Sequence, residues 1–197
     1  VEGNYLDGKI DICVIYLKKP LKKGDSITIT TPFRVKIPSG RFSRLGHLGQ
    51  SYQITQWFPK PAVYDKDGWH PMSYLNQGEF YSEFGDYDVS ITVPENYVLM
   101  ATGDLQNKDE LAFLDKKAKL TAKLIKQNKL PYRDSLGRKD MIFPESSKEK
   151  KTLRFTQKDV HDFAWFTDKR YHVLKGEIEL ESKNVTSWAL FTNSEAK

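Results

Sequence analysis

The chain has 197 residues and a formal net charge of +5, from 31 Lys and Arg against 26 Asp and Glu. This length predicts one large domain or two small ones. Apolar residues make up 39% and aromatic residues 13%, which supports a real core and excludes a chain that is disordered throughout. One cysteine excludes an intramolecular disulfide framework and a thiolate-clustered metal site. No uncharged apolar run is long enough to cross a bilayer, so no membrane interaction is expected.

The sequence opens with Val-Glu-Gly-Asn-Tyr, without an initiator methionine and without a visible signal peptide. We therefore expect it to be a piece of a longer gene product.

Period-2 alternation of apolar and polar residues dominates the first part of the chain. It runs from Ile10 to Tyr16, where we expect Cys13 to be a small buried or half-buried side chain. The clearest strand pattern extends from Ile27 to Ile37, and Pro32 within it indicates an edge strand or a bulge. Further strands are predicted at Tyr52–Phe58, Tyr87–Val93, Tyr97–Thr102, Thr152–Thr156, Phe163–Phe166, His172–Leu180 and Val185–Phe191.

Between residues 104 and 150 the pattern changes, which indicates an insertion into the sheet. A Lys- and Leu-rich segment predicts an amphipathic helix around residues 108–129, with a solvated lysine face. This helix has one aromatic residue, Phe113, and no arginine, so we expect no nucleic-acid partner. The polar stretch from Asp134 to Lys151 is expected to be partly mobile.

The patterns together predict a mainly β fold. We expect an antiparallel β-sandwich or saddle-like sheet, formed as a single β domain over residues 1–197, with the helical insertion around residues 108–129.

The four histidines, His47, His70, His161 and His172, form no recognisable metal motif. The zinc-binding sequence His-Glu-x-x-His is absent, and no two histidines have its spacing. A zinc site needs three or four converging ligands, so we interpret these side chains as surface or hydrogen-bonded residues. No cofactor or metal is therefore predicted within this chain.

Two acidic segments have alternative interpretations. Asp65-Lys66-Asp67-Gly68 resembles the start of a calcium loop, but a hairpin turn explains it more simply because later acidic ligands are missing. Glu79, Glu83, Asp86 and Asp88 lie among aromatic residues, a combination that suits a glycosidase or a sugar-binding surface. Asp86 and Asp88 are equally explained as outward residues at the start of a strand.

Motifs for other chemistry are missing. The sequence has no Gly-x-Ser-x-Gly elbow, no phosphate-binding glycine loop and no dinucleotide fingerprint. The residues alone therefore predict a β-rich binding or scaffolding domain without a complete active site.

The segment from Gln53 to Gly103 contains four distinctive short motifs, and two further segments accompany it. They are Trp57–Lys60, Gly68–His70, Gly78–Tyr81 and Phe84–Val89, with Asp159–Tyr171 and Ser43–Gly49. This set resembles the amino-terminal β domain of the zinc aminopeptidase family that includes aminopeptidase N and leukotriene-A hydrolase, and most closely a bacterial branch of it. The resemblance covers roughly residues 5–190.

The resemblance implies a non-catalytic domain that covers one side of an active-site cleft. In that family the zinc ligands, the substrate-binding strand and the catalytic tyrosine follow the β domain, and none of these motifs occurs here. Zinc is therefore expected in a missing catalytic domain, which would be one partner, with the substrate N-terminus as the other. The bacterial branch is commonly exported, which suggests a periplasmic or exported protein.

In that family a Gln or Glu of the β domain helps to hold the free α-amine of the substrate, upstream of a Phe-Pro dipeptide. Phe58-Pro59 matches, but the family's Ala-Arg and Asp-Glu-Pro motifs are missing, so three glutamines compete: Gln50, Gln53 and Gln56. The spacing to Pro59 favours Gln50.

The alternation of side chains along the strand favours Gln53, because alternate residues lie on opposite faces and the more polar face suits the wall of a cleft. The even positions are the more apolar set and the odd positions the more polar set. The even set is Gln50, Tyr52, Ile54, Gln56 and Phe58; the odd set is Ser51, Gln53, Thr55 and Trp57. The amide oxygen of Gln53 would accept a hydrogen bond from the ammonium, less strongly than a carboxylate would.

Beside the aminopeptidase domain, which is the first interpretation, two others are possible. The chain is alternatively a free-standing binding module for a carbohydrate or a protein, using Trp57, Trp69 and Tyr74. A third alternative is that the parent protein is a pseudoenzyme whose zinc ligands have degenerated.

Overall fold

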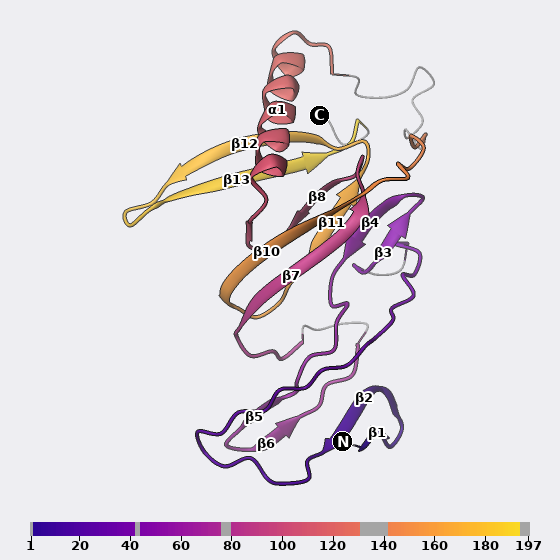
Figure 1. Ribbon diagram of the computed structural model, residues 1–197, viewed down its shortest axis with the longest axis vertical. Helices are drawn as coiled ribbons and strands as arrows, with labels where there is room; N and C mark the ends of the chain where they lie inside the picture. Colours follow the sequence, from indigo (N-terminus) through magenta and orange to yellow (C-terminus); the bar gives the residue numbers. More distant parts are fainter. Residues whose placement is uncertain (1, 42–43, 76–79, 131–141, 194–197) are drawn as a thin grey trace. The chain divides into compact units, whose positions relative to one another are not determined.

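The computed structural model describes residues 2–41, 44–75, 80–130 and 142–193. The chain forms two compact units (Figure 1). Unit 1 consists of Val1–Lys36 and Phe58–Phe84, and unit 2 of Ile37–Trp57 and Gly85–Lys197. The single domain expected over residues 1–197 stays a prediction.

Unit 1 contains two antiparallel hairpins. Strand β1 (Glu2–Leu6) pairs with β2 (Lys9–Tyr16), and β5 (Val63–Asp65) pairs with β6 (Gly68–His70). The turn of the second hairpin is closed by the Asp67 N–H, which donates to Asp65 Oδ1 at 2.9 Å. Gly68 follows with φ of 102°, a conformation that glycine adopts at little cost. The hairpin turn predicted at residues 65–68 is thus confirmed.

The strand predicted from Ile27 to Ile37 is wrong. Residues 25–38 contain no helix, turn or bend, and they pair with no strand of the described chain. Alternation shows which side chains share a face, but a strand also needs a partner for its backbone N–H and C=O groups. Pro32 removes one N–H donor from the middle of the segment.

The expectation that Cys13 is buried or half-buried is wrong, because its side chain is exposed. It lies on β2, in a two-stranded sheet, and two strands alone bury little side-chain surface.

In unit 2, a three-stranded antiparallel sheet has the order β7-β10-β9. Its strands are β7 (Gly85–Pro94), β10 (Lys150–Val160) and β9 (Asp104–Leu105). Ile91 of β7 and Leu153 and Phe155 of β10 are buried, while the alternate residues are exposed. The period-2 pattern of the sequence therefore corresponds to one packed face and one solvated face.

A four-stranded antiparallel sheet has the order β3-β4-β11-β8. Its strands are β3 (Gly46–Leu48), β4 (Ser51–Ile54), β11 (Trp165–Asp168) and β8 (Val98–Ala101). Ile54 and Leu99 are buried in the core of unit 2. The strand predicted over Tyr52–Phe58 ends at Ile54, because Gln56 has a left-handed backbone with φ of 51°.

The helix α1 (Lys108–Lys126) packs on the hairpin of β12 (His172–Glu179) and β13 (Asn184–Phe191), and the hairpin extends past it (Figure 1). Leu114 and Ala118 are buried on its packed face. Acidic residues lie in its first turn and lysines in its last turn, which suits the helix dipole.

These elements confirm the mainly β, antiparallel fold with one helical insertion. Of the polar stretch expected to be mobile, residues 134–141 lie outside the described residues. No helix in the described part of the chain combines the length and apolar character that a membrane span requires.

Phe155 provides a test of the core of unit 2, because its side chain is fully buried. Replacing it with alanine should lower the free energy of unfolding by about 3–5 kcal/mol, from lost burial and the cavity left behind. Leu120→Ala on α1 is the control: Leu120 is exposed, so its replacement should change stability by less than about 0.5 kcal/mol. Urea titration of both variants measures the difference. Equal losses of unfolding free energy would contradict the placement of Phe155 in the core of unit 2.

Candidate functional site

The three candidate glutamines lie on or next to β4, but the structure gives each a different environment. Strand β4 is paired on both sides, with β3 and with β11. Gln53 lies opposite Gly46 of β3 and opposite Phe166 of β11. Because directly opposed residues share a face, Gln53 lies on the same face of the sheet as Phe166, which is 41% exposed. Ile54 is buried, and Gln53 is half-buried on the more open face.

The amide oxygen of Gln50 is already used by the chain itself. The ammonium of Lys169 donates hydrogen bonds to Gln50 Oε1 and to the carbonyl of Pro144, and to Ser146 Oγ at 3.1 Å. The same ammonium lies 5.2 Å from the centroid of the Tyr97 ring. Lys169 is only 8% exposed. Gln50 therefore performs the chemistry expected of an amine-binding residue, but its ammonium comes from a lysine of unit 2.

Gln56 lies beyond the end of β4, where the left-handed backbone ends the alternation of the strand. Its Oε1 is buried and has no hydrogen-bond partner, as is also true of Thr55 Oγ1 and Trp165 Nε1 among the described residues. A buried polar atom without a partner is unfavourable by roughly 1–3 kcal/mol. The alternation of faces along a strand therefore applies to Gln53 and Ile54 but does not extend to Gln56.

Trp57 is a packing residue. Its indole N–H donates to the carbonyl of Phe163 at 3.1 Å, and its ring packs edge-on against Trp165 at 6.4 Å between centroids. Phe163 is fully buried. Trp57 therefore belongs to the packed part of unit 2 and does not offer an open aromatic surface.

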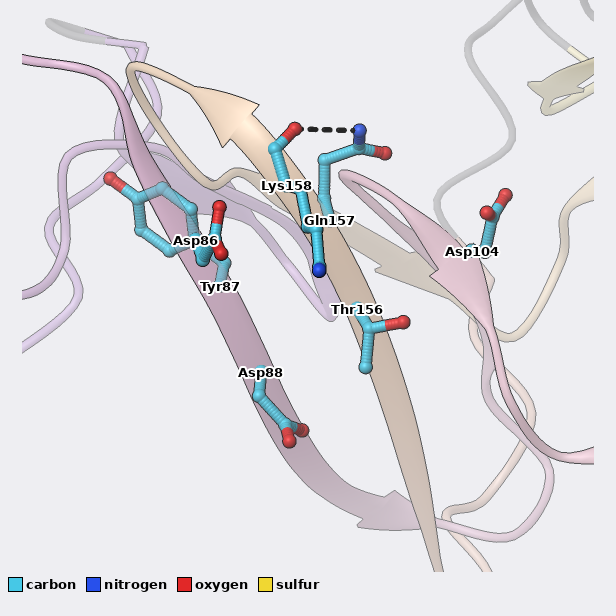
Figure 2. A pocket seen from close by; sticks show the side chains of 7 residues that line it. All are labelled: Asp86, Tyr87, Asp88, Asp104, Thr156, Gln157 and Lys158. Carbon is cyan, nitrogen blue, oxygen red and sulfur yellow. Dashed lines mark hydrogen bonds between the residues drawn. The ribbon is translucent and has the colours of Figure 1, made fainter.

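A hollow of about 430 Å³ lies on the polar face of the β7-β10-β9 sheet (Figure 2). Its lining comes from all three strands and consists of Asp86, Tyr87, Asp88, Asp104, Thr156, Gln157 and Lys158. Arg154 binds the Asp88 carboxylate through two hydrogen bonds of 2.8 and 2.6 Å, and Asp86 Oδ1 accepts from the Asp159 N–H at 3.1 Å. Two carboxylates of the predicted acidic patch therefore have structural partners.

The other two members of that patch are Glu79 and Glu83. Glu83 belongs to unit 1, and Glu79 lies outside the described residues, as do Gly78 and Ser43 of the motifs discussed above.

Two acid groups that line the hollow have pKa values shifted in opposite directions. Hydrogen bonds and the positive charge from Arg154 hold the pKa of Asp88 below its usual value of 3.8. Burial raises the pKa of Tyr87, with a smaller contribution from the negative charge of Asp162.

In unit 1, the β5–β6 hairpin carries polar and aromatic residues on opposite faces. Asp65 accepts hydrogen bonds from His70 Nε2 at 2.7 Å and from the Tyr81 hydroxyl at 3.3 Å. On the other face Tyr64 and Trp69 are opposed, with ring centroids 4.9 Å apart, and are 65% and 66% exposed. This exposed aromatic pair was only half anticipated, since the sequence singled out Trp69 without Tyr64.

Two further histidines lie within hydrogen-bonding distance of an oxygen atom. His47 Nδ1 lies 2.9 Å from the carbonyl of Gly49, and His172 Nε2 lies 2.6 Å from Asn193 Oδ1. Across the described ranges, no three His, Cys, Asp or Glu side chains come together as a metal site would require.

Sequence reasoning did not find Lys169. A signal was present, because the charged triplet Asp168-Lys169-Arg170 begins two residues after the apolar pair Trp165-Phe166. Comparison of the chain with protein-family models, curated proteins and solved structures finds no match.

Lys169→Met should loosen the segment around Pro144 and Ser146, because it removes the ammonium that joins them to Gln50. We expect a loss of about 1–3 kcal/mol in unfolding free energy and faster amide exchange in residues 142–149. Lys119→Met on α1 is the matched control, since Lys119 is exposed. Unchanged exchange in residues 142–149 would show that Lys169 does not hold this segment.

Arg154→Met should raise the pKa of Asp88 toward 3.8, because both hydrogen bonds to the carboxylate are lost. The folded-state pKa is depressed, so the pair stabilises the fold above the unfolded pKa near 4, and this contribution is lost as the pH falls through the folded value. Carboxyl NMR titration of both proteins measures the shift, with Arg34→Met as a control. The same Asp88 midpoint in wild type and Arg154→Met would contradict this cause.

Proposed function

We propose that this chain is the non-catalytic β domain of a zinc-dependent aminopeptidase and that it contributes to recognition of the substrate N-terminus. The short motifs around Trp57–Lys60, Gly68–His70 and Phe84–Val89 support this proposal. In this proposal zinc is held by a catalytic domain, and no residue of this chain is assigned to it.

The observation that carries the proposal is the place of Gln53. It lies in the middle of a sheet, between β3 and β11, so its backbone is fixed from both sides. Its side chain shares the open face of this sheet with Phe166. A neutral amide oxygen held on a rigid strand suits a ligand for an ammonium group, because a preorganised acceptor loses little entropy on binding.

The other two glutamines have environments that differ from that of Gln53. Gln50 Oε1 accepts from Lys169, so a substrate ammonium would have to compete with a lysine already in place. Gln56 Oε1 is buried, so a ligand would need an opening of the protein to reach it. The partners of the domain in this proposal are a catalytic domain and a peptide with a free α-amine.

A series of three Gln→Glu variants in the longer, zinc-binding protein tests the proposal. Gln53→Glu should lower the KM for aminoacyl substrates by about five- to tenfold, because a carboxylate holds an ammonium more strongly than an amide does. It should leave the KM for a substrate with a blocked amine unchanged. An unchanged KM for both substrates would remove Gln53 from the site.

The other two variants of the series are internal controls. Gln50→Glu should form an ion pair with Lys169 and change stability without changing KM. Gln56→Glu should destabilise the fold, because it places a carboxylate where the amide oxygen finds no donor. A KM effect confined to Gln56→Glu would assign amine recognition to Gln56 in place of Gln53.

The alternative function, a free-standing carbohydrate- or protein-binding module, has one supporting observation. Tyr64 and Trp69 form an exposed aromatic pair on β5–β6, and Tyr74 is 49% exposed. Aromatic rings of this kind can pack on the apolar face of a sugar ring.

Trp69→Ala tests this alternative directly. If the module binds oligosaccharides, calorimetry should show an affinity at least about tenfold weaker for Trp69→Ala, while Phe113→Ala on α1 binds as wild type does. Absence of binding to a panel of neutral and acidic oligosaccharides by the wild type would remove the carbohydrate form of this alternative.

A further inference from the structure

Unit 1 leaves many of its apolar side chains uncovered. Val63 is the one buried hydrophobic side chain among its described residues. Residues 25–36 belong to no strand, and Ile27, Ile29, Phe33 and Val35 within them are all exposed. Exposed apolar rows of this extent on an extended backbone indicate a surface that pairs with another strand.

The far end of the β12–β13 hairpin in unit 2 has the complementary pattern. Figure 1 shows this hairpin extending past α1. Strand β12 ends with alternating acidic and apolar residues, Glu177 to Glu179, and Leu180 follows it; all four residues are exposed. Ile178 and Leu180 are 53% and 51% exposed.

The backbone geometry shows which groups of β12 lie on its free edge. The Leu180 N–H donates to the Lys183 carbonyl at 3.0 Å, toward β13, whereas the Val173 N–H donates to Thr121 Oγ1 of α1 at 3.3 Å, away from β13. Backbone groups of an antiparallel strand alternate in direction. The N–H and C=O groups of Glu177 and Glu179 therefore point off the edge of β12 that no described strand pairs with.

One antiparallel register matches both segments in side-chain chemistry. It places Glu177 opposite Lys36, Ile178 opposite Val35, Glu179 opposite Arg34 and Leu180 opposite Phe33. Each charged pair is of opposite sign, and each apolar residue faces another. Pro32 and Pro38 bound the ladder, because proline has no N–H to donate.

The four charged side chains of this register are exposed and form no ion pair within the described part of the chain. Opposite-charge and apolar cross-strand pairs each stabilise an antiparallel pairing modestly, and several act together.

We propose that two copies of this chain associate by strand pairing, in which residues 33–36 of one copy add to the free edge of β12 at residues 177–180 of the other. Each copy carries both segments. A reciprocal exchange therefore uses both segments of both copies and closes a two-fold dimer.

Charge reversal with mixing tests the proposal. Sedimentation velocity should show the wild type associating with rising concentration, and less so at high ionic strength. Arg34→Glu with Lys36→Glu, and separately Glu177→Lys with Glu179→Lys, should each weaken self-association at least about tenfold, because like charges face each other. An equal mixture of the two variants should associate again, since each variant is complementary to the other.

The control matched to Arg34→Glu with Lys36→Glu is Lys18→Glu with Lys19→Glu, which lowers the net charge by the same amount at exposed positions outside the register. This variant should associate as the wild type does, and circular dichroism should show that all variants keep the fold. A wild type that remains monomeric, reversals no more disruptive than the control, or a mixture that stays monomeric would each overturn the proposal.

Disulfide trapping tests the register and the source of the partner strand. In a Cys13→Ser background, Val35→Cys on one copy and Ile178→Cys on the other should form an intermolecular disulfide on oxidation, because directly opposed residues bring their Cβ atoms close. Val35→Cys with Leu180→Cys should react more slowly. A variant carrying both Val35→Cys and Ile178→Cys that forms only an intramolecular disulfide would show that the strands pair within one chain, which would overturn the dimer.

Discussion

The pairing of β11 with β4 on one side and β8 on the other is the contact on which the candidate site depends. It opposes Phe166 to Gln53 and Trp165 to Ile54, and so decides which face of β4 is open and which is buried. The chain leaves β11 at Asp168, and the next residue is Lys169, whose ammonium binds Gln50. One strand and the residue after it thus give Gln50 and Gln53 different surroundings, although their side-chain chemistry is identical.

Burial is distributed unequally between the two units. Unit 2 has a core built around side chains such as Phe155 and Phe163, whereas Val63 alone is a buried hydrophobic residue of unit 1 in the part of it that the structure describes. A unit of this kind is stabilised by whatever covers its apolar residues. The proposed second copy would cover part of these residues, and self-association can be tested independently of the proposed enzymatic role.

The sequence predicted those parts of the fold that depend on local patterns. Alternation located β7, β10 and β13, and helical spacing located α1, because one buried face imposes these periods directly. It failed at residues 27–37, where the same alternation exists without a partner strand. The site was less predictable: the end of β4 depends on the left-handed backbone of Gln56, and the burial of Lys169 depends on Pro144 and Ser146 far along the chain. Neither long-range acceptors nor a single backbone conformation can be read from residue periodicity.

The distance between Gln53 Oε1 and the α-amino nitrogen of a bound substrate analogue tests the central claim most directly. A crystal structure of the longer, zinc-binding protein with such an analogue measures it. The account predicts a hydrogen bond of about 2.7–3.2 Å, on the sheet face that Gln53 shares with Phe166. An ammonium held by other residues, with Gln53 Oε1 well beyond hydrogen-bonding distance, would contradict it.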